Sequence, residues 1–220
     1  MMPAALPSPT RPELRDDLEH ATLDKLEHDA TLTELELSGA QLSNQNARGV
    51  SFQTVRLAGA DVSGSRLEHL RVTEAVLSAC NLANVHARAA HVQTVVIQDS
   101  RLTGMALPEG RLTDVTFKDC RIDLASFGSC RLERVSFEDC MLAQTDFLDA
   151  QLHGVRFDGC DLTNADIRGA RLKRCELRGS DLTGLQGVES LRGAAIEWRD
   201  IIEMAGVWAA ALGIEVLDAE

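Results

Sequence analysis

The 220-residue sequence contains no tyrosine, and aromatic residues of all kinds make up only 4% of it. A chain with so few large rings is expected to build a narrow core from aliphatic and small side chains. Acidic residues outnumber basic ones, and the net charge of −12 argues against direct binding to nucleic acid. No run of about 18 apolar residues is present, so the sequence predicts no membrane-spanning helix.

Signals for targeting and for chemistry are absent as well. The segment Met1 to Pro7 lacks a basic stretch followed by a long apolar one, so we expect no secretory signal and a cytoplasmic location. The sequence has no phosphate-binding loop, no G-x-S-x-G motif and no C-x-x-C spacing among its six cysteines. We therefore expect no catalytic residue, no cofactor and no metal ion, and we interpret the protein as a non-enzyme.

An apolar residue instead recurs at every fifth position from Leu32 to Leu182, over 31 consecutive positions without insertion or deletion. All six phenylalanines lie on this register. A second register, two residues earlier, carries mostly small residues and every cysteine: Cys80, Cys120, Cys130, Cys140, Cys160 and Cys175. Cysteine at such a position acts as a small hydrophobe, so we expect free, buried thiols.

A period of five residues fits neither a helix nor a long strand. Five residues turn an α-helix by about 500°, so the apolar positions would wind around it. Two residues after each apolar centre, most positions hold Gly, Asn or Asp, which tolerate a left-handed backbone. We infer a short extended segment followed by a corner, repeated so that the chain coils and successive coils stack by backbone hydrogen bonds.

The segments Asn81-Leu82, Asp161-Leu162, Asp181-Leu182 and Ala165–Gly169 resemble the A(D/N)LXX unit of the pentapeptide-repeat family. The resemblance implies an all-β solenoid over residues 30–184. It would be a right-handed quadrilateral β-helix with four units in each of about eight coils. Centres one coil apart would then share a face. Such sharing would stack Phe117, Phe137 and Phe157 on one face and Phe127 and Phe147 on the opposite face.

Two departures from this pattern carry expectations of their own. Phe52 is the only phenylalanine before Phe117, so we expect looser packing in the N-terminal half. The segment Met105–Gly110 places a bulky residue in the small register and includes Pro108, which cannot donate a backbone hydrogen bond. A local kink or bulge is expected there.

The ends are predicted to cap the solenoid. Residues 1–29 would form a tail, disordered over residues 1–12, and a short helix over residues 12–28 that covers the first coil. Residues 185–220 would form a C-terminal cap whose apolar pattern shifts at Leu191 and Ile196. Its helix would start at Asp200 and Glu203 in the manner of a capping box and end at Gly213, before a short strand over residues 214–217.

This cap resembles the C-terminal end of the quinolone-resistance members of the family, in which apolar end pieces join two cylinders. The resemblance implies a homodimer, and a monomer with a simple cap is the alternative. The candidate interface consists of Ile201, Met204, Trp208, Leu212, Ile214 and Val216.

We interpret the chain as a rigid protein-interaction scaffold whose partner the sequence does not name. The candidate interaction patch is acidic, and we expect its members to lie next to one another: Asp119, Glu138, Asp139, Asp146, Asp149, Asp158 and Asp166. The alternative function, implied by the resemblance, is binding to DNA gyrase by imitation of duplex DNA. Residues 31–184 carry 20 acidic and 17 basic side chains. A duplex of similar length would carry roughly 22 negative charges.

Overall fold

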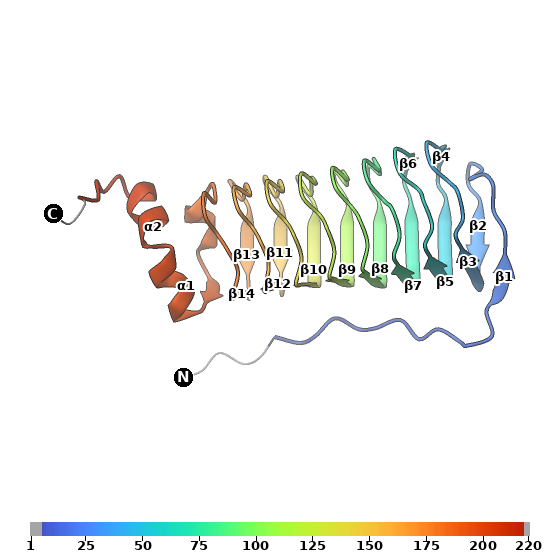
Figure 1. The fold of residues 1–220 in the computed structure, drawn as a ribbon, viewed down its shortest axis with the longest axis horizontal. Coiled ribbons are helices and arrows are strands. Elements are labelled where there is room, and N and C mark those ends of the chain that lie inside the picture. Colours follow the sequence, from blue (N-terminus) through green and yellow to red (C-terminus); the bar gives the residue numbers. More distant parts are fainter. Residues whose placement is uncertain (1–5, 218–220) are drawn as a thin grey trace.

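The computed structural model describes residues 6–217, which form a parallel β-solenoid of about nine turns followed by two short helices (Figure 1). The predicted all-β solenoid is confirmed. The number of turns exceeds the expected eight because β1 (Glu19–Ala21) and β15 (Ala194–Ile196) add rungs outside the predicted repeat. Strand β1 pairs with β3 in the first coil, and β15 pairs with β14 in the last.

The remaining elements follow in chain order. The strands of the first half are β2 (Thr31–Thr33), β3 (Leu35–Ser38), β4 (Asn46–Arg48), β5 (Ser51–Ala58), β6 (Arg66–Glu68), β7 (Arg71–Ser78) and β8 (His91–Gln98). Those of the second half are β9 (Arg111–Lys118), β10 (Arg131–Glu138), β11 (Gln151–His153), β12 (Arg156–Asp158), β13 (Arg171–Lys173) and β14 (Cys175–Arg178). A 3-10 turn, η1 (Val188–Leu191), and the helices α1 (Trp198–Glu203) and α2 (Ala205–Ala211) complete the chain.

Each coil takes 20 residues, because Leu132 pairs with Leu112 on one side and with Leu152 on the other. Four units per coil give four faces, which we number by the centres of one coil: Leu112 on face 1, Phe117 on face 2, Ile122 on face 3 and Phe127 on face 4. Faces 1 and 2 form the long strands from β5 to β10, whereas face 3 and most of face 4 are joined by isolated bridges.

The corners between faces have the predicted left-handed backbone. Every fifth residue from Asp29 to Gly184 has a positive φ angle. The amide of such a corner residue donates to a carbonyl of the next coil, as Asp139 does to Asp158 at 2.9 Å. A side chain at Gly159, in the next coil, would place its Cβ 2.7 Å from Asp139 Oδ1. An aspartate in one rung therefore fits against a glycine in the next.

The phenylalanines stack as predicted. On face 2, the ring centroids of Phe117 and Phe137 lie 4.9 Å apart, and those of Phe137 and Phe157 lie 5.0 Å apart. On face 4, Phe127 and Phe147 lie 5.2 Å apart. The two stacks meet edge-to-face across the core, which is the geometry that aromatic quadrupoles favour.

The looser N-terminal half is also confirmed. An entirely apolar cavity of about 80 Å³ extends between Phe52 and Phe117. Its walls include Val72 and Val92, which stand in a face-1 column otherwise filled mainly by leucine. The corresponding void in the C-terminal half is only about 20 Å³. The cavity therefore lies where the centres carry smaller side chains.

The kink expected at Met105–Gly110 is wrong. Met105 is buried, and the bridges between coils continue through Ala106. Pro108 stands one residue after a centre, where the amide takes no part in the ladder between coils. At the equivalent Leu148, the amide donates to a carboxylate of its own turn. Proline therefore removes no inter-coil hydrogen bond at this position.

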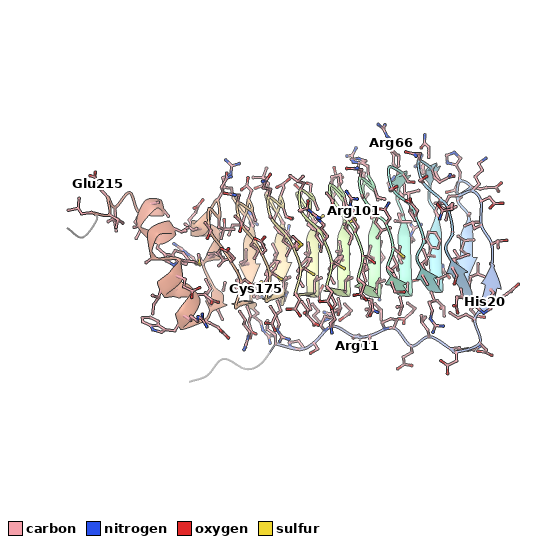
Figure 2. The ribbon with its side chains drawn as sticks, viewed as in Figure 1. Arg11, His20, Arg66, Arg101, Cys175 and Glu215 are labelled. Carbon is pink, nitrogen blue, oxygen red and sulfur yellow. The ribbon has the colours of Figure 1, made fainter. Side chains whose placement is uncertain are left out.

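The helix predicted over residues 12–28 is also wrong. Residues 6–15 instead form an extended strap that runs back along the outside of the solenoid, where Arg11 is labelled, and a turn at residues 16–17 leads into β1 (Figures 1 and 2). Leu6 is buried, and Pro9 and Pro12 are half-buried. This spacing of three is that of a polyproline II helix, which prolines favour over an α-helix. The expected disorder is likewise wrong for residues 6–12, and residues 1–5 lie outside the described part of the chain.

The C-terminal cap keeps the predicted change of phase. Ile196 of β15 pairs with Leu177, one residue short of a full coil, and Leu191 is buried. Gly213, with φ 68°, follows the end of α2 as expected.

The start of the cap helix and the final strand differ from the prediction. Helix α1 begins at Trp198 after Glu197, and no side chain caps it. Asp200 is instead buried and accepts a hydrogen bond from the amide of Gly179 at 3.0 Å. The expected capping box is therefore wrong, because Asp200 ties the helix to the last coil. Residues 214–217 form no strand.

Candidate interaction surfaces

Four of the predicted acidic residues lie together, on face 2 and the corner after it. They are Asp119, Glu138, Asp139 and Asp158, and we call them the acidic ladder. The amide of Asp119 donates to the carbonyl of Glu138 at 3.0 Å, and that of Asp139 donates to Asp158. The backbone thus holds these side chains on rungs spaced by about 4.8 Å. Lys118 lies beside Glu138 in register and offsets part of the charge.

The other three predicted residues, Asp146, Asp149 and Asp166, do not lie next to this ladder. They belong to face 4 and the corner after it, where Asp146 bridges to Asp166. Phe137 of face 2 and Phe147 of face 4 contact each other across the core, with centroids 6.3 Å apart. The expectation of one continuous patch is wrong, because two units along the chain correspond to half a coil.

Asp146 and Asp166 are also engaged within their own face. Arg168 donates to both oxygens of Asp166, the shortest contact being 2.6 Å to Oδ2, and this hydrogen bonding lowers the pKa of the carboxyl. Asp146 accepts hydrogen bonds from the hydroxyl of Ser126 and the amide of Leu148. The acidic ladder on face 2 is therefore the stronger candidate surface.

An apolar surface covers the C-terminal end. Of the predicted interface residues, Leu212, Ile214 and Val216 are exposed, and Ile201 and Trp208 are half-buried. Met204 is only 4% exposed, so it anchors the cap to the core and contributes no surface. Sequence reasoning missed three exposed residues: Trp198, Ile202 and Leu217.

The edge between faces 1 and 2 carries a site that the sequence did not reveal. Asp114, only 7% exposed, accepts hydrogen bonds from Arg134 at 2.7 and 2.8 Å and from the amide of Thr10 in the strap at 3.1 Å. The hydrogen bond from Arg134 is the main cause that lowers the pKa of Asp114. Arg156 donates to the carbonyl of Leu6 farther along the same edge. The strap is therefore fastened mainly through its backbone atoms, which residue identities do not predict.

The cysteines are free and buried, as predicted. Burial raises the pKa of Cys130 to about 12, so its thiol stays protonated at neutral pH. Within residues 6–217, no group of three or more His, Cys, Asp or Glu residues is placed to hold a metal ion. None of the helices in this part of the chain is long and apolar enough to cross a membrane.

These observations define a β-solenoid built from five-residue units. Two family models match the sequence: one for a pentapeptide repeat region, over residues 111–186, and one for pentapeptide repeats in eight copies, over residues 36–69. Together they span half of the chain. The chain belongs to the pentapeptide-repeat family.

Several solved structures resemble the fold at low identity. HetL, from the cyanobacterium Nostoc sp. strain PCC 7120, is 20% identical over 78% of this chain and 89% of its own, with a TM-score of 0.33. Full-length QnrB1, a plasmid-mediated fluoroquinolone resistance protein, is 18% identical over 89% of this chain and 97% of its own, with a TM-score of 0.37. Rfr23, from Cyanothece 51142, is 16% identical over 62% of this chain and 91% of its own, with a TM-score of 0.34. Among curated proteins, none matches this chain.

Proposed function

We propose that this protein is a non-catalytic, rigid scaffold that presents the acidic ladder to a protein partner. The observation that carries the proposal is the backbone ladder beneath these carboxylates. Because each corner amide is bonded to the next coil, the side chains stand at fixed spacing before a partner arrives. Binding to such a surface costs little ordering of the scaffold itself.

The proposed unit is a homodimer joined through the C-terminal end, in the cytoplasm. Its support is the group of exposed apolar side chains there, in which Trp198 is 77% exposed and Leu212 is 75% exposed. Apolar patches of this kind are typical of protein–protein contacts. Sedimentation at increasing concentration tests the proposal, and Leu212→Glu combined with Ile214→Glu should leave a monomer with unchanged solenoid stability.

The partner is to be sought by affinity capture with the full-length protein as bait. The informative variant is Asp139→Lys with Asp158→Lys, which reverses two charges of the acidic ladder. Its matched control is Asp146→Lys with Asp149→Lys, which makes the same charge change on face 4. A partner of the ladder should be lost from the first bait and retained by the second. Equal retention by both baits would rule out the ladder as the contact.

DNA gyrase is the second candidate partner, because a rod with acidic rungs on one side has one element of duplex mimicry. The near balance of 20 acidic and 17 basic side chains over residues 31–184 weighs against it, since a duplex of similar length would carry roughly 22 negative charges. A supercoiling assay across a protein concentration range, with and without a fluoroquinolone, tests this candidate. Inhibition or protection that the face-2 charge reversal abolishes would support it, and no effect at any concentration would eliminate it.

A further inference from the structure

Face 1 carries a charged surface of the opposite sign. Arg111, Arg131, Gln151 and Arg171 stand directly above one another in the ladder from β9 to β13. A parallel column two residues further along each rung contains Glu133, His153 and Lys173. Between the two columns lies an open hollow of about 270 Å³ with Leu152 at its floor. We call Arg131, Gln151, His153, Arg171 and Lys173 the basic trough; the acidic Glu133 also lines the hollow.

Within residues 6–217, the cations of the trough and the neighbouring Arg111 form no salt bridge. Arg111 and Arg131 are in-register neighbours, and like charges directly opposite each other destabilise a sheet. Among residues 6–217, none of Arg111, Arg131, Arg171 and Lys173 forms a salt bridge, and Glu133 is paired with Arg134. Many other arginines of the solenoid have an acidic partner, as Arg121 has in Asp123 at 2.9 Å. The cations of this surface therefore gain no ion-pair stabilisation within the described residues and keep their charge available for a partner.

We propose that the basic trough binds an extended acidic segment of a partner protein. The trough follows the long axis of the solenoid, so an extended chain can lie along it and contact successive rungs. Carboxylates suit the site because the guanidinium group binds them through two parallel hydrogen bonds. A polynucleotide suits it less, because the rest of the chain makes the net charge −12 and repels a dense polyanion.

The test is fluorescence anisotropy of the full-length protein with a short labelled peptide of alternating glutamate and threonine. The trough variant is Arg131→Gln with Arg171→Gln. The matched control is Arg66→Gln with Arg101→Gln, two exposed arginines on other faces, neither of them in a salt bridge within the described residues (Figure 2). The dissociation constant should rise roughly tenfold or more in the trough variant, from the loss of charge-assisted hydrogen bonds. It should stay within about twofold in the control.

Two further measurements keep the outcome decisive. Thermal unfolding should show that the trough variant is no less stable than the parent, because the substitution removes like-charge repulsion. A peptide with glutamine in place of glutamate should not bind. Equal loss in both variants, equal binding of the two peptides, or tighter binding of a single-stranded oligonucleotide of the same charge would each overturn the proposal.

This site does not depend on the acidic ladder. The Asp139→Lys and Asp158→Lys variant should bind the acidic peptide at least as tightly as the parent does. Loss of the captured partner with retained peptide binding would separate the two surfaces.

Discussion

The apolar cavity in the N-terminal half predicts that larger side chains will stabilise the protein there. Val92 is the most informative position, because Leu112, Leu132 and Leu152 occupy the same column in the following coils. Val92→Leu adds one methylene toward the cavity, worth about 0.8 kcal/mol on burial. The whole cavity of about 80 Å³ corresponds to about 2 kcal/mol, at about 24 cal/mol per Å³. Val72→Leu combined with Val92→Leu should therefore gain between about 1 and 2 kcal/mol.

The control makes the same substitution where the interior is full. Val135 lies among the phenylalanine stacks and is 1% exposed. Val135→Leu should overpack this region and destabilise the protein by about 1 to 3 kcal/mol. Urea unfolding at equilibrium measures both effects, as a shift in midpoint at unchanged slope.

The changes in the free energy of unfolding must have opposite signs for Val92→Leu and Val135→Leu. A destabilisation by Val92→Leu as large as that by Val135→Leu would mean that the N-terminal half has no free volume. A changed slope would mean that the coils unfold separately, as repeat arrays can, and the comparison would then be made on the first transition.

Three further predictions concern the edges and the interior. Asp114→Ala leaves Arg134 without its main partner, so it should cost about 1 to 3 kcal/mol and speed tryptic cleavage of the strap after Arg15. The pKa of Asp114 is lowered in the folded state, so its contribution should be present above the ordinary carboxyl pKa and lost as the pH falls through the lowered pKa; the difference in unfolding midpoint between the parent and Asp114→Ala, measured at decreasing pH, checks this. Gly159→Ala, at φ 62° and beside Asp139, should destabilise more than Gly179→Ala, at φ 53° in open space, when both are measured by thermal unfolding. The thiol of Cys130 should resist a disulfide reagent at neutral pH until the protein unfolds.

The central solenoid could be predicted from the sequence because the residue types of each five-residue unit determine its local geometry. A centre such as Leu132 requires an inward direction, and a corner such as Asp139 tolerates the left-handed backbone that turns the chain. Once four units make a coil, the stacking of Phe117 on Phe137 follows without further information. The same arithmetic places Asp146 opposite Asp139, and the prediction of one acidic patch failed because it treated neighbouring units as neighbouring surfaces.

The extended strap could not be predicted from residue identities in this way. Its hold on the solenoid depends on the backbone amide of Thr10 and the carbonyl of Leu6, and every residue but proline offers both groups. The prolines that argued for disorder instead favour an extended conformation, which an edge with Asp114 and Arg156 can bind. A buried carboxylate on an outward position is visible only in three dimensions.

The two ends of the solenoid are closed unequally, and this difference indicates where a second copy can join. At the N-terminal end, β1 pairs with the first coil, and the strap precedes β1 in the chain. At the C-terminal end, β15 is followed by short helices that bury Met204 but leave Trp198 and Ile202 in solvent. An open strand edge invites pairing unless it is covered, and an apolar cover itself invites a partner. The proposed homodimer would form at the C-terminal end and would leave faces 1 and 2 free along both cylinders for the basic trough and the acidic ladder.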